Sequence, residues 1–450
     1  MLPKQETLTV VIPLCSNAGR LKDLKECFAA IQAEVWSNRA TAGPIQFGRM
    51  KRVHFARFAI TEPDVGPDAA PIPPCLVFST EYDGDLDAHI DELIRFGGPA
   101  LLFVLACCEG FESEAGPDEL RVRRFLKAKR SRPEAFYIGA LGRTVDQIDR
   151  ERRLCDSIRD CAAKLPPNMD PIEAWGQIAS HVMPSAGRKG IQAINLPAHQ
   201  MGRGIAFVGA VAGGALLALY LIYAFPWIIA PLVFLVFWLR LEEDIHAERV
   251  AALQGAESLA QSGVQESLRE QGHAKFEDRW DQNQLTAITV IAPSALRRAL
   301  LRLVLAAVSF RASFRFTRGL LDGVPTIHFA HWHVIEKGRR LLFVSNYDGS
   351  WASYLDDFIV HAAGPISAIW SHSVGFPPTR FLMWGGAEDG PHFKAFARRH
   401  QIVPSVWYSA YPDLSVEEIT RNSQLVAGLE DARLGQARYR QETKTWLEAI

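Results

Sequence analysis

Three histidines lie on one short stretch in the second half of the chain, which reads IHFAHWHVI over residues 327–335. Its β-branched and aromatic residues predict a strand, and alternation along a strand places His331 and His333 on one face and His328 on the other. Two imidazoles on one face are about 7 Å apart, so both can ligate a metal ion or one can ligate haem iron. His331, His333 and the nearby His372 are therefore candidate cofactor ligands, with histidines that only hydrogen-bond in the sheet as the alternative.

A Tyr-Asp-Gly turn occurs twice, at 82–84 and at 347–349, each time between a predicted strand and a predicted helix. The structural interpretation is that Asp and Gly form the turn and that the next residue, Asp85 or Ser350, caps the helix. The functional alternative is that the Asp carboxylates and Tyr hydroxyls line a cavity between two sheets and transfer protons there. In that alternative the candidate catalytic residues are Asp348, Tyr347 and His328.

Both turns belong to an internal repeat. CLVFSTEYDGDLDAHIDELI from Cys75 aligns without gaps to RLLFVSNYDGSWASYLDDFI from Arg340, and shorter matches flank it in the same order. VHFARFAI from Val53 matches IHFAHWHV from Ile327, and PEAFYIGALGRTVDQI from Pro133 matches PSVWYSAYPDLSVEEI from Pro404. The chain therefore contains two copies of a unit of roughly 140 residues.

The periodicity within each copy predicts strand, helix, strand, strand, helix and strand, the order of a ferredoxin-like unit. The last strand is predicted at 100–107 in the first copy and at 366–372 in the second. Two such units commonly bury their sheet faces against each other. The predicted fold class is α+β, with two tandem ferredoxin-like units forming an intrachain pseudo-dimeric barrel and a transmembrane helical hairpin inserted between them.

The predicted boundaries follow the repeat. They are 1–150 for the first copy, 151–203 for a linker with helical segments, 204–241 for the membrane hairpin, 242–280 for a charged helical linker, 281–430 for the second copy and 431–450 for a helical tail.

Composition excludes some classes of protein. The 450 residues carry 49 Lys and Arg against 50 Asp and Glu, a net charge of −1, which argues against a basic nucleic-acid binder. The seven cysteines all precede residue 162 and lack metal-ligand spacing, so they predict a reducing compartment.

An apolar block interrupts this even composition, because no charged residue lies between Arg203 and Arg240. About 20 apolar residues span a bilayer as one helix, so the block predicts a membrane segment, with a buried core helix as the alternative. Pro226 divides it into two arms, which predicts a hairpin, complete or re-entrant. Positive charges at both ends then place both copies in the cytoplasm, at the membrane.

The predicted helix at 296–308 and the residues after it are basic on one side and apolar on the other. Such a segment binds an anionic membrane surface, and plain domain packing is the alternative. The candidate membrane-surface residues are Arg297, Arg298, Arg302, Arg311 and Arg315.

Duplication and element order together make the chain resemble the dimeric α+β barrel superfamily, which includes dye-decolourising peroxidases and chlorite dismutases. In those peroxidases a Gly-x-x-Asp-Gly motif faces the haem and a His ligates it. Here Asp83-Gly84 and Asp348-Gly349 are present, but Thr80 and Ser345 stand where the first Gly is expected. The resemblance implies a fold whose members bind haem, bind small lipophilic molecules or only regulate.

Two functional hypotheses follow. The first is a membrane-anchored, peroxidase-like oxidoreductase that acts on a hydrophobic or membrane-derived substrate, with haem as the candidate cofactor. The second is a non-enzymatic ligand-binding or scaffold protein that keeps the fold without catalysis. The expected partners are the lipid bilayer and a lipophilic small molecule, and not nucleic acid.

Overall fold

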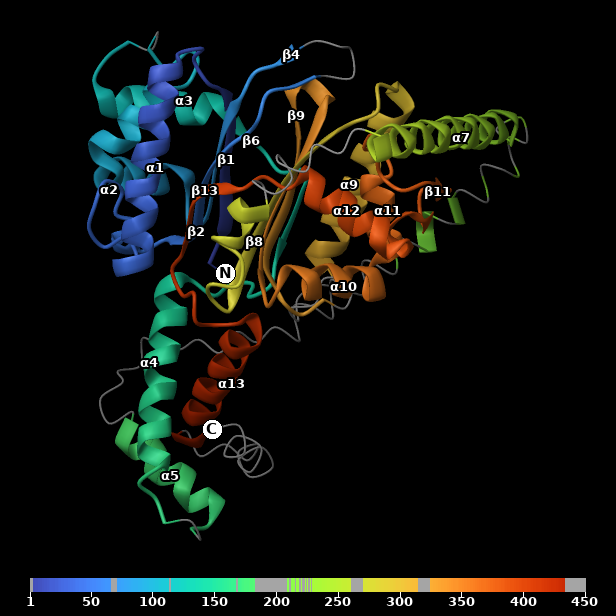
Figure 1. Ribbon diagram of the computed structural model, residues 1–450. Helices are drawn as coiled ribbons and strands as arrows, with labels where there is room; N and C mark the ends of the chain where they lie inside the picture. Colours follow the sequence, from blue (N-terminus) through green and yellow to red (C-terminus); the bar gives the residue numbers. More distant parts are fainter. Residues whose placement is uncertain are drawn as a thin grey trace.

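The computed structural model of the chain describes residues 3–65, 71–112, 115–166, 169–182, 229–259, 270–314 and 324–433, with scattered residues between 209 and 227. The fold is α+β, as the sequence predicts, and two antiparallel sheets lie in the middle of the molecule (Figure 1).

The first sheet has five strands in the order β13-β2-β5-β1-β6. They are β1 (Gln5–Pro13), β2 (Val53–Ile60), β5 (Cys75–Asp83), β6 (Arg130–Ser131) and β13 (Pro404–Ser409). Every residue of β5 is buried, because helices cover one face of the sheet and the second sheet covers the other.

The second sheet has four strands in the order β7-β9-β10-β8. They are β7 (Ala135–Ile138), β8 (Gln282–Val290), β9 (Ile327–Ile335) and β10 (Arg340–Asp348). Two small ribbons lie outside both sheets, β3 (Asp64–Val65) with β4 (Pro71–Ile72) and β11 (Thr379–Arg380) with β12 (Trp384–Gly385).

The two copies exchange one strand each. β13 belongs to the second copy but pairs with β2 of the first, and β7 belongs to the first copy but pairs with β9 of the second. The copies therefore pair within one chain, as the repeat predicts. Neither sheet is complete without a strand from the other copy.

Helices cover the outer face of each sheet (Figure 1). The first sheet is covered by α1 (Ala18–Asn38), α2 (Leu86–Ala106) and α3 (Asp118–Lys129). The second is covered by α9 (Ala295–Phe314), α10 (Trp351–His361), α11 (Ala363–Trp370) and α12 (Gly390–His400). Asp85 and Ser350 cap α2 and α10, which confirms the structural interpretation of the residue after each Tyr-Asp-Gly turn.

The remaining helices extend away from the sheets (Figure 1). α4 (Val145–Ala162), α5 (Pro171–Val182) and α13 (Val416–Arg433) pack into an arm with its own apolar core. α7 (Ile229–Leu259) projects on the side of the second sheet. Within the described ranges, single turns of 3-10 helix include η1 (Phe47–Arg49), η3 (Glu336–Gly338) and η4 (Gly386–Glu388).

The strands predicted at 100–107 and 366–372 are wrong. The first run belongs to α2, which breaks at Gly98 (φ 46°) and resumes at Pro99, and the second is α11 with the turn that follows it. A short apolar run fits a buried helix as well as a buried strand, so periodicity could not distinguish them. The true fourth strands are the exchanged β7 and β13.

The predicted transmembrane hairpin is contradicted. Among the described residues, no helix combines the length and the apolar character needed to cross a membrane. α7 starts inside the apolar block at Ile229, but Arg240, Glu242 and Glu243 follow within the same helix. The predicted membrane localisation rested on this hairpin and is corrected with it. Most of residues 204–228 lie outside the described part of the chain.

Candidate functional site

The histidines of β9 meet the first sheet rather than an open cavity. His331 and His333 share a face, as predicted, and both are fully buried, with Nδ1 of His331 2.8 Å from Nε2 of His333. Nε2 of His331 lies 2.8 Å from Oε1 of Glu81 on β5, and Nδ1 of His333 lies 3.1 Å from Oγ of Ser131 on β6. Each imidazole therefore uses both of its nitrogens.

One assignment of protons satisfies this chain of hydrogen bonds. Ser131 donates its O–H to Nδ1 of His333, His333 donates Nε2–H to Nδ1 of His331, and His331 donates Nε2–H to Glu81. Both imidazoles are neutral in this assignment. Burial lowers the pKa of His331, and burial together with the adjacent His331 lowers the pKa of His333 well below its ordinary value.

The chain ends on a buried ion pair. Nη2 of Arg57 on β2 lies 3.7 Å from Oε1 of Glu81, and neither side chain is exposed. Arg57 also donates to Gln284 at 3.1 Å and Thr286 at 3.2 Å on β8, and to the side chain of Asn346 on β10. Burial opposes the charge of Glu81, but Arg57 and the hydrogen bond from His331 outweigh it and lower the pKa of the Glu81 carboxyl.

Both copies pair a histidine with the Asp of the Tyr-Asp-Gly turn. Nε2 of His328 lies 2.7 Å from Oδ1 of Asp348, and Nε2 of His54 lies 2.9 Å from Oδ1 of Asp83. The strand register shifts next to each histidine, and this bulge releases its side chain from strict alternation. Strict alternation predicts that the side chain of His328 points toward the helices, as that of Ala330 does. Because of the bulge, it does not.

The second oxygen of each Asp holds a helix of the arm. Oδ2 of Asp83 accepts the N–H of Val145, the first residue of α4, at 2.8 Å. Oδ2 of Asp348 accepts the N–H of Val416, the first residue of α13, at 2.8 Å. A helix leaves its first N–H groups without partners, so each carboxylate satisfies one of them. Asp83 and Asp348 therefore each connect the end of a strand to a histidine and to the start of a helix.

The two His–Asp pairs differ in one neighbour. The hydroxyl of Tyr411, a residue of the second copy, lies 2.7 Å from Nδ1 of His54. The first copy has Ala140 at the equivalent position and so offers no such hydroxyl. Burial raises the pKa of Tyr411 well above its ordinary value, so the hydroxyl stays protonated and donates to His54. The ring of Tyr411 lies 5.9 Å from that of His328 and fills the space between the two pairs.

The tyrosines of the turns lie on the outer faces of the sheets. Tyr347 stacks on Tyr354 of α10 at 3.8 Å between ring centroids, and Tyr82 stacks on His89 of α2 at 4.0 Å. Both tyrosines belong to the cores beneath the helices. Tyr347 therefore does not share a cavity with His328 and Asp348.

His372 is not brought to the other histidines. It follows α11, and its carbonyl accepts the N–H of Ala292 just beyond the end of β8, two strands away from β9. Burial, with Arg297 and His246 nearby, lowers the pKa of His372 to about 3. It belongs to the packing between α7, α9 and α11.

A haem or a metal ion does not fit His331 and His333, the candidate ligands on β9. The nitrogens of His331 and His333 are engaged in the chain described above, and the space beside His328 is filled by aromatic side chains. The ring centroid of Phe55 lies 5.4 Å from that of His328 and 5.8 Å from that of Phe329, so these rings pack against one another. Within the described ranges, no group of three or more His, Cys, Asp or Glu side chains could hold a metal ion. A small, mostly apolar pocket between the second sheet and α10, α11 and α12 measures about 20 Å³.

The basic side of α9 is partly internal. Arg297 is buried, donates to the carbonyl of Ser371 at 2.9 Å and lies 3.4 Å from Glu242 of α7, so its predicted surface role is wrong. Arg302 is exposed, and Arg298 and Arg311 are half-buried. Arg315 lies outside the described residues.

Sequence reasoning missed the acid that organises the site. Glu81 and Asn346 occupy equivalent positions two residues before the Asp of each turn, and each contacts the other copy. The available signal was a carboxylate within a strand that begins with an apolar run, CLVFSTEYD, since such a residue is rarely buried without a partner.

Comparisons of the chain with family models, with curated proteins and with solved structures give no match.

Proposed function

We propose that this protein is a non-enzymatic binding protein, in which the paired repeats form a rigid frame and the apolar start of α7 is the binding surface. The observation that carries the proposal is that α7 presents a continuous apolar surface that no described element covers. The side chains from Leu232 to Trp238 are between 40% and 65% exposed. A contiguous apolar surface of this kind marks an interaction site.

The candidate catalytic groups support the same proposal, because they are occupied by structural contacts. His328 and Asp348 bond to each other, and Asp348 also holds the start of α13. Tyr347 packs under α10 on the opposite face of the sheet. A peroxidase-like reaction would require a free ligand for iron and room for a substrate, and the geometry of His331 and His333 favours neither.

The apolar surface continues beyond α7. Described residues that precede it are exposed as well: Leu216, Leu217, Tyr220, Tyr223, Phe225 and Trp227. Isolated exposed apolar residues are ordinary on protein surfaces, but a cluster within one segment is not. The partner is therefore expected to be apolar where it contacts this segment.

The proposal can be tested with ANS, a fluorescent dye that binds exposed apolar surface. The dye is titrated into the wild-type chain and into F234E/F237E, each diluted until it sediments as a single chain. Both phenylalanines are exposed, so the substitutions leave the core intact. The control is Val360→Glu, which places one such carboxylate on an exposed residue of α10.

We expect the wild-type chain and the control to bind the dye and F234E/F237E to lose most of that fluorescence. Equal fluorescence from all three proteins would overturn the proposal. A hemin titration gives an independent readout: a stoichiometric Soret band that is lost in H331Q/H333Q would favour the oxidoreductase instead.

A further inference from the structure

We propose that the apolar start of α7 pairs antiparallel with α7 of a second copy of this chain. The inference rests on the proposed function, since it names the partner of the same surface. It follows from how α7 is held, from the shape and area of its apolar surface, and from what surrounds its base.

α7 is fixed to the second repeat by its middle, so its start projects as a rigid rod. The side chain of Glu243 is buried and accepts the backbone N–H of Leu382 at 2.7 Å and of Phe381 at 3.0 Å. Nε2 of His246 lies 2.9 Å from the carbonyl oxygen of Phe376, and Glu242 accepts from Ser294 at 2.6 Å. A surface that is already ordered loses little conformational entropy when it binds.

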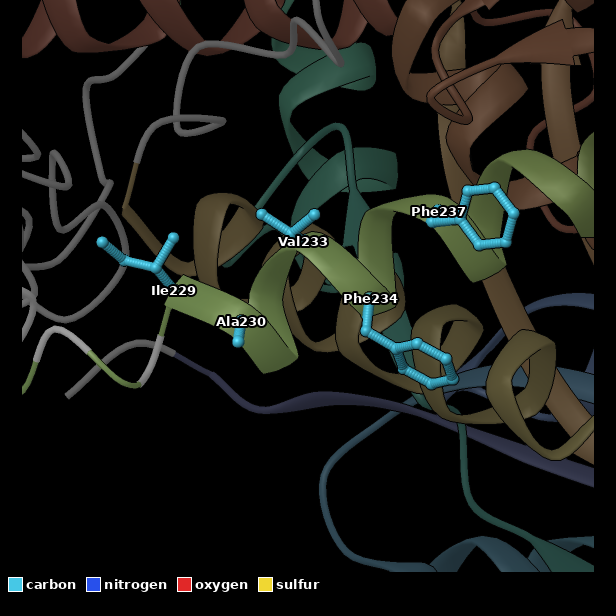
Figure 2. A pocket seen from close by; sticks show the side chains of 5 residues that line it. All are labelled: Ile229, Ala230, Val233, Phe234 and Phe237. Carbon is cyan, nitrogen blue, oxygen red and sulfur yellow. The ribbon is translucent and has the colours of Figure 1, made fainter.

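The exposed part of α7 has the shape of a helix-packing surface. Ile229, Val233 and Phe237 are spaced four residues apart and form one ridge, beside which lie Ala230 and Phe234 (Figure 2). An open hollow runs along these five side chains. Ridges and grooves of this spacing are what a second helix packs into.

The area involved is that of a stable interface. Most large apolar residues from Ile229 to Leu241 are exposed by 40% or more. With roughly 150 Å² per large side chain, about half of it accessible, these residues expose on the order of 700 Å² around the helix, and Phe381, Met383 and Trp384 at its base add on the order of 200 Å². A specific protein interface of standard size buries about 800 Å² on each partner.

The exposed stretch carries no charge, so it offers nothing for an acidic or basic ligand to recognise. The first charge is Arg240, which pairs with Glu243 and Asp244 of its own helix and lies 5.4 Å from the ring centroid of Phe381. The chemistry required of the partner is therefore a second apolar surface on a rigid element.

The chain itself supplies such a surface in the right arrangement. Around the base of α7 lie exposed aromatic and apolar side chains, Trp238 on the helix and Phe381, Met383 and Trp384 beside it. In an antiparallel pair, the aliphatic tip of each α7 at Ile229 meets this aromatic base of the other copy. A twofold axis makes both contacts identical, which closes the assembly at two chains.

The test is sedimentation of the full chain over a range of concentrations, together with photo-crosslinking. We expect the wild-type chain and Val360→Glu to shift from one to two chains with increasing concentration, and F234E/F237E to remain a single chain. With benzoylphenylalanine at position 234, we expect a crosslinked product of two chains in which the linked peptide of the second chain comes from α7. The same group at Leu120, exposed on α3, should give no such product.

The outcomes separate this inference from the proposed function. A wild-type chain that stays single at every concentration, but still binds ANS through Phe234 and Phe237, would overturn the pairing and leave the proposed function standing. Flotation of that single chain with phosphatidylcholine and phosphatidylglycerol vesicles, lost in F234E/F237E, would also overturn the pairing. A dimer that persists in F234E/F237E with unchanged dye binding would overturn both.

Discussion

Arg57 and His331 occupy equivalent positions of the two repeats and meet on the same carboxylate, that of Glu81. Nη2 of Arg57 lies 3.7 Å and Nε2 of His331 lies 2.8 Å from its Oε1 atom. The equivalent of Glu81 in the second copy is Asn346, which accepts from Arg57. The two copies have therefore diverged so that one buried positive charge faces one buried negative charge between the sheets.

This arrangement predicts that Arg57→Met strongly destabilises the protein. Methionine fills much of the same volume, but it leaves Glu81 charged and without its cation in the core. Removing one partner of a buried ion pair typically costs about 3–5 kcal/mol. Urea unfolding followed by tryptophan fluorescence measures the loss.

The double variant R57M/E81Q should recover part of that stability, because it removes both charges together. Arg123→Met is the control, since Arg123 pairs with Asp87 and Asp91 near the surface, where an ion pair contributes less than about 1 kcal/mol. Equal losses for Arg57→Met and Arg123→Met would contradict the prediction.

Because His89 is buried, we expect the protein to lose stability in acid. Nε2 of His89 lies 2.7 Å from the hydroxyl oxygen of Thr80. At the equivalent positions of the second copy, the hydroxyl of Tyr354 donates to that of Ser345 at 2.8 Å. Burial, with Arg52 and Arg130 nearby, lowers the pKa of His89 from 6.5 to about 3. Between these values the unfolded chain binds a proton that the folded chain does not. The stability contributed by neutral His89 is therefore complete above pH 6.5 and decreases as the pH falls toward 3.

Replacing His89 by the residues of the second copy should flatten this dependence. In T80S/H89Y the tyrosine does not titrate in this range, so the decrease in unfolding free energy should be smaller by up to about 1.4 kcal/mol per pH unit. The slope, measured by urea unfolding between pH 6.5 and 4, is the readout, and it is separate from any packing cost at neutral pH. An unchanged slope would show that His89 is not buried in its neutral form.

The repeat and the Tyr-Asp-Gly turns were predictable because they depend on local sequence. Asp85 and Ser350 cap helices as expected, and the strands that carry His331 and Asp348 lie near their predicted positions. The strands predicted at 100–107 and 366–372 were not, since a short apolar run has no period that separates strand from helix.

The site itself could be predicted only in part. His331 and His333 share a face by simple alternation, but the bulge at His328 depends on pairing with β10 and leaves no mark in β9. Glu81 meets His331 across 250 residues of sequence, through two sheets that each borrow a strand. Nothing local specifies that contact.

Asp348→Ala should destabilise the protein more than an ordinary capping substitution. The change removes the acceptor for the N–H of Val416 and the partner of His328 at once, and both groups are at least partly buried. We expect a loss of about 2–4 kcal/mol, since each buried donor left without a partner costs about 1–3 kcal/mol. Asp85→Ala, which removes one exposed helix cap, is the control at about 1 kcal/mol. Similar losses for the two variants would show that Asp348 acts only as a turn residue.

We expect Glu243 to hold α7 to the turn at 379–382. Its carboxylate accepts two successive N–H groups, those of Phe381 and Leu382, whose φ values of 50° and 66° lie in the left-handed region. Two non-glycine residues in that region are strained, and converging N–H groups of this kind form a site for an anion, which Glu243 supplies. Glu243→Ala should therefore release the 379–382 turn and the middle of α7, with a loss of about 2–3 kcal/mol in the free energy of unfolding.

Hydrogen exchange measures this release. Exchange should accelerate in peptides covering 379–384 and 240–250, and it should accelerate less in Glu243→Gln, which keeps one acceptor oxygen. Glu248→Ala, on the exposed side of the same helix, should leave exchange unchanged. Protection that persists in Glu243→Ala would mean that apolar packing alone holds α7 in place.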